Sequence, residues 1–389
     1  MTIVQKFSVT ESAPLAHPSI RNPALAATSS KLLGLELLRF AAAMAVLFYH
    51  YKHFARIPDA AAAAGADFPF AAWLWPLYSY GQFGVQLFWG ISGYIFFWKY
   101  GRAIHSGAVS ATRFFWLRFS RLYPLHFVTL ILVAGLQLAH RQLTGEIYVF
   151  PANGFGEFVR QLFLATDWGA QPSQTFNAPI WSVSAEVAVY AAFFLLLRRY
   201  PPSLKLCAGI VAGGMALLLC GFKPIPVICA IFFFAGGLAA SFPPLSPYRR
   251  FLAASFAIAI FGAAALTGVL HDPFLVPWVI LATLPFLLAA VAGELHGFDR
   301  WQRGIEAAGN LTYSTYLLHF PLQLTFAIGV ATTGIIVAPA DPLLLVAYLA
   351  VTMIVSAISY RALELPAQAW IRRRRLGSTI GNASNRQLQ

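Results

Sequence analysis

The sequence contains few charged residues and few acidic ones in particular. Only 11% of its 389 residues are charged, and 14 acidic residues stand against 27 lysines and arginines. Charged side chains cover much of the surface of a soluble domain, so this scarcity argues against a soluble protein of this length. The formal charge of +13 also does not indicate nucleic-acid binding, which needs a basic face on a soluble module.

Cysteines and the common catalytic motifs are also scarce. The three cysteines, Cys207, Cys220 and Cys229, lie in or beside apolar runs at spacings that match no metal or redox motif. We expect them to act as small packing residues. The sequence has no metal-spaced histidine and cysteine cluster, no glycine-rich phosphate loop and no Gly-x-Ser-x-Gly motif, so no metal site is predicted.

Long apolar runs make up most of the chain. Hydrophobic residues account for 59% of the sequence, far more than the core of a soluble domain needs. The runs of membrane-spanning length fall near residues 32–54, 73–98, 121–139, 180–197, 204–221, 225–241, 251–270, 274–293, 308–331 and 343–362. The predicted fold is therefore an all-α integral membrane protein with about ten transmembrane helices.

The two ends of the chain differ from its apolar middle. Residues 1–31 hold serine, proline, alanine and scattered charges but no apolar run, which predicts a disordered cytosolic tail and no cleaved signal peptide. Residues 32–372 are expected to form one transmembrane domain. Residues 373–389 are expected to form a basic cytosolic tail, too short for an appended soluble domain.

The distribution of positive charge predicts the orientation. With a cytosolic N-terminus, the predicted inner loops and tails hold twenty of the 27 lysines and arginines, whereas the outer loops hold five and the spans two. Basic residues concentrate on the cytosolic side of membrane proteins. Both termini are therefore expected in the cytosol.

Two polar residues stand inside the first apolar run. Arg39 and His50 are about eleven helical steps apart, which places them within about 20° of one face and about 16 Å apart along the axis. Ionisable residues within a span are functional candidates by default. The alternative is an arginine that reaches one interface and a histidine that lies at the other.

A carboxylate in the fourth run is a candidate partner for His50. Glu186 lies about six residues inside its span, and its depth differs from that of His50 by only a few ångströms at about 1.5 Å per residue. A carboxylate that accepts one imidazole N–H leaves the other nitrogen free as a base. The alternative is a structural polar contact between helices.

Basic residues gather before the third run. Arg118 and Arg121 share a helical face at i and i+3, and Arg113 lies nearby. Guanidinium groups suit phosphates, so a long phosphorylated cofactor anchored here, with Arg39 above it, would extend toward His50. The alternative is that these arginines only mark the topology.

The remaining histidines carry weaker signals. His319 lies near the middle of the ninth run, where a lone histidine is more often a packing residue than a catalyst. His53, His126 and His140 lie near the ends of spans and are interpreted as interfacial residues.

Six blocks in the chain resemble those of the acyltransferase family 3 membrane proteins, over about Leu32 to Arg372. They are Gly34 to His50 with its Arg-x10-His spacing, Gly84 to Phe97 with Ser92-Gly93, Arg118 to Pro124, Trp181 to Glu186, Tyr313 to His319 and Glu364 to Pro366. The chain departs from the usual pattern at Trp89, where the family has phenylalanine, and at Phe40, where it has glycine. Neither departure removes a candidate catalytic group.

This resemblance implies a membrane-bound O-acyltransferase in the bacterial inner membrane. Such an enzyme transfers an acyl group, expected here to be acetyl from acetyl-CoA, to a carbohydrate hydroxyl such as that of an exopolysaccharide. His50 is then the general base with Glu186 as its partner, and the acyl donor contacts Arg39, Arg113, Arg118 and Arg121. Further candidates for substrate contact are Ser92, Trp181, Ser182, Tyr316 and His319.

Several alternatives stay open from the sequence. Surface polysaccharide, lipid-linked oligosaccharide, lipochitin oligosaccharide and macrolide all offer an acceptor hydroxyl, and direct transfer is not separated from an acyl-His50 intermediate. A transporter or polysaccharide flippase could also use intramembrane His, Glu and Arg. A third alternative is a sensor or assembly scaffold. The oligomeric state is not indicated.

Overall fold

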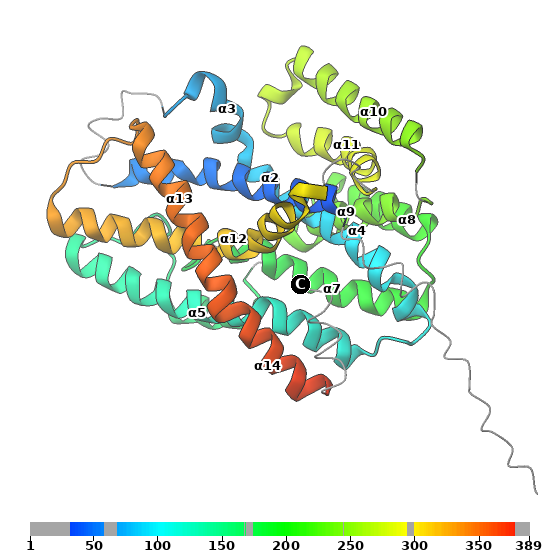
Figure 1. Ribbon diagram of the computed structural model, residues 1–389, viewed down its shortest axis with the longest axis horizontal. Helices are drawn as coiled ribbons and strands as arrows, with labels where there is room; N and C mark the ends of the chain where they lie inside the picture. Colours follow the sequence, from blue (N-terminus) through cyan, green and yellow to red (C-terminus); the bar gives the residue numbers. More distant parts are fainter. Residues whose placement is uncertain are drawn as a thin grey trace, which may run out of the picture. The chain divides into compact units, whose positions relative to one another are not determined.

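The computed structural model describes residues 32–57, 68–166, 168, 174–243, 245–293 and 299–377. Within these ranges every regular element is helical and no strand forms, so the predicted all-helical class is confirmed. The tail expected over residues 1–31 lies outside the described residues. Residues 373–376, predicted to be tail, instead continue the last helix (Figure 1).

The helices follow one another with short connections. The α-helices are α2 (Leu33–His50), α3 (Ala71–Tyr80), α4 (Gly84–His105), α5 (Ala111–Thr144), α6 (Phe155–Leu162), α7 (Ile180–Arg199), α8 (Leu204–Leu219), α9 (Ile225–Ala240), α10 (Pro247–Leu266), α11 (Val276–Val291), α12 (Gln302–Thr333), α13 (Pro342–Ser359) and α14 (Leu365–Leu376). Short 3₁₀ turns lie at η2 (Tyr51–Arg56), η4 (Gly81–Phe83), η5 (Val269–His271) and η6 (Asp299–Trp301), and η7 (Tyr360–Glu364) is a π-helical turn.

Five helical stretches are long and apolar enough to cross a membrane. They are Leu33–Arg56, Ala111–Thr144, Ile180–Arg199, Pro247–Leu266 and Pro342–Leu376. Three further apolar helices, α8, α9 and α11, are shorter. The second predicted run is divided, because η4 separates α3 from α4. The helices thus support a membrane protein, while the count of ten spans stays a prediction.

Helix ends follow local side-chain chemistry. Ser110 caps α5 by accepting the backbone N–H of Arg113 at 3.2 Å, and Gly145 ends that helix with φ 81°, a conformation that glycine adopts without steric cost. Asp341 caps α13 in the same way, accepting the N–H of Leu343 at 2.8 Å. These signals define elements but do not determine how they pack.

Glycines allow α4 and α9 to pack at very short range. A Cβ at Gly93 would collide with the Phe233 carbonyl, and one at Gly236 would collide with the Gly90 carbonyl. Small residues permit this approach between membrane helices, where packing rather than water exclusion drives association. Figure 1 shows α7 beside this pair. The largest core of the protein, rich in phenylalanine, surrounds these three helices.

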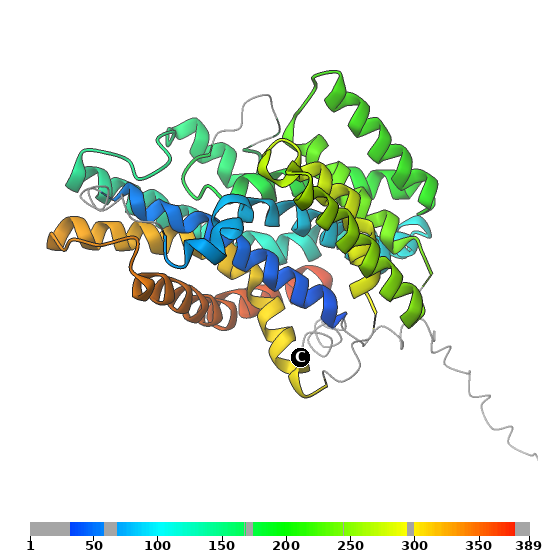
Figure 2. The same cartoon turned by 90° about the horizontal axis from the view of Figure 1, so that it is seen from above.

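Helices α2 and α12 run side by side in the same direction (Figures 1 and 2). A Cβ at Gly309 of α12 would collide with the Glu36 side chain near the start of α2. Near the other end, Gln323 Nε2 donates to the His50 carbonyl at 2.8 Å. This pairing places the end of α2 against the polar middle of α12.

Candidate active site

His50 is the last residue of α2 and has a defined tautomer. Its Nδ1 lies 2.8 Å from the Val46 carbonyl, and a carbonyl only accepts, so Nδ1 carries the proton and donates. The Nε2 lone pair is therefore left free to accept a proton. A half-buried imidazole held in this way can act as a general base.

Two other histidines contact His50, and we call His50, His53 and His319 the histidine cluster. The His50 ring centroid lies 5.1 Å from that of His53 and 4.8 Å from that of His319. Gln323 holds the cluster together, because its Oε1 lies 3.1 Å from His53 Nδ1 while its Nε2 binds the His50 carbonyl. Among the described residues, no group of His, Cys, Asp or Glu is arranged to hold a metal ion.

Several candidates from the sequence lie beside this cluster. Tyr316 lies one turn before His319, and their ring centroids are 6.1 Å apart. The Tyr316 and Ser182 hydroxyls are hydrogen-bonded at 2.7 Å. Trp181 packs edge-on against Trp89 at 5.7 Å. The structure thus brings Trp181, Ser182, Tyr316 and His319 to the same region as His50.

A proline contributes to this arrangement. Pro321 has no N–H, so the carbonyl of Leu317 loses its usual donor within α12. Asn177 Nδ2 supplies a hydrogen bond to that carbonyl at 3.1 Å. The segment before α7 is thereby tied to α12 beside His319.

The structure does not join His50 to Glu186. The Glu186 carboxylate lies beside the Ser92 and Tyr190 hydroxyls, and its nearest charged neighbours are Arg118 and Arg39. One carboxylate oxygen, Oε1, is buried without a hydrogen-bond partner. The predicted direct pair was wrong because depth alone does not say which way a side chain projects. His50 projects toward α12, whereas Glu186 projects toward α4.

Two of the predicted donor-binding arginines already have acidic partners. Arg39 Nη1 lies 3.0 Å from a Glu36 oxygen, and Arg121 Nη1 lies 3.4 Å from a Glu364 oxygen. Glu364 is buried, also bonds Ser314, and lies in the π-helical turn η7. These pairs reduce the positive charge that Arg39 and Arg121 offer to a phosphate.

Arg118 differs from those two arginines. Its Nη2 donates to the Tyr100 hydroxyl at 3.1 Å, and its guanidinium lies 4.9 Å from the Phe96 ring centroid. Its Nε is buried without a partner, and no carboxylate lies within ion-pair distance of it among the described residues. Arg113, by contrast, is exposed in the first turn of α5. Arg118 is therefore the best placed of the four to bind an anion.

The sequence underestimated several residues of this region. His53, His126 and His140, interpreted as interfacial, are 7%, 0% and 4% exposed and lie inside the protein. Each bonds a neighbour: His126 the Gln161 carbonyl at 2.9 Å, and His140 the Glu146 carbonyl at 2.9 Å. Gln323 carried no signal, because a glutamine in an apolar run shows no partner until the fold supplies one.

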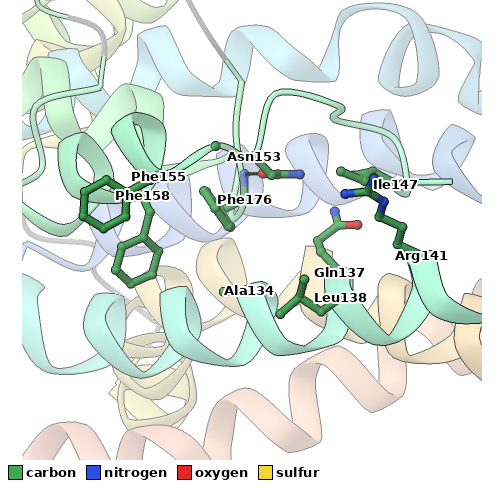
Figure 3. Close-up of a pocket in the computed structure, with 10 residues that line it drawn as sticks. Ala134, Gln137, Leu138, Arg141, Ile147, Asn153, Phe155, Phe158 and Phe176 are labelled. Carbon is green, nitrogen blue, oxygen red and sulfur yellow. Dashed lines mark hydrogen bonds between the residues drawn. The ribbon is translucent and has the colours of Figure 1, made fainter.

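A cavity of about 220 Å³ lies between α5 and the segment that follows it (Figure 3). Phe155, Phe158 and Phe176 supply its aromatic wall, and Gln137, Arg141 and Asn153 its polar groups. The two amides are already used. Gln137 exchanges hydrogen bonds of 3.0 Å with the Tyr148 backbone, and Asn153 accepts the Phe176 N–H.

Tyr148 connects this cavity wall to the histidine cluster. Burial raises the pKa of the Tyr148 phenol, so the hydroxyl stays protonated and donates to the His53 carbonyl at 2.8 Å. The ring of Phe150 also packs edge-on against that of His53 at 5.6 Å. The cavity is therefore separated from the cluster by one layer of side chains.

Comparison with known proteins supports the family suggested by the sequence blocks. Residues 32–361 match the model described as an acyltransferase domain. The chain belongs to acyltransferase family 3. It is also 33% identical over 149 residues to acyltransferase MdmB of Streptomyces mycarofaciens. That match covers 36% of this chain and 35% of the relative, so the chain spans about a third of the relative's length. No solved structure matches.

Family membership identifies an acyltransferase, and the apolar helices agree with a membrane-bound one. The matched range includes His50, Glu186, the three inner arginines and His319, so every candidate of the histidine cluster and of the Arg118 region lies within the family domain.

Proposed function

We propose that this protein is an O-acyltransferase that moves an acetyl group from acetyl-CoA to a carbohydrate hydroxyl. The observation that carries the proposal is the locked tautomer of His50, whose Nε2 is free. In the reaction, Nε2 takes the proton of the acceptor hydroxyl while its oxygen attacks the thioester carbonyl. The carbon–sulfur bond breaks, and the proton passes to the coenzyme A sulfur.

The donor is proposed to approach from the end of the bundle that holds Arg118. Its unpartnered Nε and its place beside aromatic rings suit a phosphate or an amide of the pantetheine arm. Arg39 and His50 are about 16 Å apart along α2, a span that a long cofactor arm could bridge. Acetyl-CoA is thus a donor whose length matches the separation of the two groups.

Glu186 is proposed to serve the donor side rather than His50. Its carboxylate lies beside Ser92 and Tyr190, with Arg118 as a charged neighbour. A buried carboxylate there holds an arginine in place and limits the orientations of two hydroxyls. Ser92 and Glu186 then position the thioester arm between Arg118 and the histidine cluster.

The acceptor is proposed to be a saccharide hydroxyl of a surface or exopolysaccharide unit, presented at the outer side of a bacterial inner membrane. His50 ends α2, and under the predicted topology this end faces outward. A polar acceptor could reach it there without crossing the bilayer core. Tyr316, Ser182 and Trp181 would line its approach to His50.

Thioester consumption tests the proposal directly. Purified protein in detergent, given acetyl-CoA and a lipid-linked or soluble oligosaccharide, should release free coenzyme A thiol and form an acetylated oligosaccharide. The measurement is thiol release together with the mass of the acceptor. A transporter or flippase would consume no thioester, and a scaffold would keep its function when His50 is replaced by glutamine. Either outcome would reject the enzyme assignment.

The orientation is a second testable expectation. Because the predicted inner segments hold twenty basic residues and the outer loops five, both termini should be cytosolic, with about ten spans between them. A C-terminal alkaline phosphatase fusion should be inactive, and a C-terminal green fluorescent protein fusion should fluoresce. Strong phosphatase activity with a dark fluorescent fusion would reverse the assignment of inner and outer residues.

A further inference from the structure

We propose that His319 is the positioning partner of His50 and shares the proton that His50 removes from the acceptor. This inference rests on the proposed function, since it assigns the role that a carboxylate was expected to fill. It concerns a side chain that sequence reasoning treated as a packing residue.

His319 is buried in an unusual state. Its side chain is 0% exposed, and neither Nδ1 nor Nε2 has a hydrogen-bond partner. Other buried histidines are bonded through at least one nitrogen, as His126 is to Gln161 and His53 to Gln323. Buried polar groups are normally paired because an unpaired one is costly. An imidazole with both nitrogens open is therefore expected to gain a partner during the reaction.

The geometry identifies that partner. The His319 ring centroid lies 4.8 Å from the His50 ring, and the two planes are tilted by 44°. His50 turns its Nδ1 to the Val46 carbonyl, which leaves its Nε2 as the nitrogen available to a substrate or a second ring. On its other side His319 faces Tyr316, whose hydroxyl is already bonded to Ser182.

The surroundings favour a neutral partner over an acidic one. No carboxylate contacts either ring in the part of the chain that the structure describes. The charged groups near the cluster, Lys52 and Arg56, are basic, and His53 is occupied by Gln323. A proton that arrives on His50 therefore finds the His319 lone pair as the acceptor nearest to it.

The proton balance of the step is closed. The acceptor O–H bond breaks and its proton moves to His50 Nε2, where the positive charge is shared with His319. The acceptor oxygen bonds the thioester carbon, and the carbon–sulfur bond breaks. The shared proton then returns to the coenzyme A sulfur as thiol, which leaves both imidazoles neutral. No oxidant, reductant or metal is needed.

Two substitutions test this role. His319→Gln keeps a polar side chain of similar size but cannot carry the proton, and His319→Phe keeps the ring without its nitrogens. Both should lower kcat about tenfold while KM for acetyl-CoA stays within about twofold of wild type. The matched control is His126→Gln, which removes a buried histidine bonded to Gln161 and should leave kcat unchanged. A packing role would instead reduce the yield of folded protein and spare kcat per folded molecule.

Coupling to His50 provides the second readout. Groups that act as a unit are non-additive, so His50→Ala combined with His319→Gln should be no slower than His50→Ala alone. If the His319 variants do not fold, a proton inventory on wild-type protein in mixed H₂O and D₂O decides. A curved dependence of kcat supports a shared proton, and a linear one overturns it.

The outcomes separate this inference from the proposed function. Wild-type protein that releases no thiol contradicts the acyltransferase mechanism as a whole. Wild-type protein that is active, with His319→Gln at full kcat or with multiplicative losses in the double variant, overturns only the role of His319.

Discussion

Replacing His50 with alanine should lower turnover by about 10²- to 10⁴-fold, the range typical of a lost general base. Binding of acetyl-CoA should stay close to wild type, because His50 lies at the far end of α2 from Arg39 and makes no contact with the arginines. The measurement is acetyl transfer at equal protein levels, with donor binding followed separately by calorimetry.

Glu186→Gln provides the contrast for that experiment. No hydrogen bond or ring contact links Glu186 to His50 among the described residues, and effects at sites without shared partners usually add as free energies. The losses of His50→Ala and Glu186→Gln should therefore multiply in the double variant. Substantial turnover in His50→Ala would remove His50 from the mechanism.

Replacing Arg118 with alanine should raise KM for acetyl-CoA about ten- to a hundredfold. A charge-assisted hydrogen bond to a phosphate is worth about 1.5 to 3 kcal/mol, which corresponds to that change in affinity. The effect should exceed that of Arg121→Ala on KM, because Arg121 is already paired with Glu364 at 3.4 Å. The measurement is KM for donor and acceptor separately, since only the former should change.

Two control variants sharpen this prediction. Arg113→Ala removes an exposed guanidinium near the start of α5 and should leave both KM values unchanged. Arg118→Lys keeps the charge but not the planar fork, so it should recover only part of the donor affinity. If Arg118→Ala lowers only the amount of protein in the membrane, Arg118 marks topology and does not bind the cofactor.

The two halves of the site are therefore expected to respond differently. Variants in the histidine cluster should change kcat, whereas variants around Arg118 should change KM for the donor. Glu186 lies with the second group. This division follows from the separation of the two groups along α2, about 16 Å from Arg39 to His50.

The sequence by itself determined the helical class, the membrane character and the family. Each follows from a local property: apolar runs of spanning length, the scarcity of charge, and six short blocks in order. It also singled out His50, Arg118, Tyr316 and His319, because a polar group inside an apolar run stands out wherever the helices later pack.

Only the tertiary structure decided which of these residues meet. The depth of Glu186 can be estimated from the sequence, but its direction depends on how α7 packs against α4. Likewise, Gln323 and His53 join the cluster only because α12 runs beside the end of α2. Glu364 reaches Arg121 from a π-helical turn that no sequence signal predicted. Contacts between residues far apart in the chain are set by helix packing, and local patterns do not contain them.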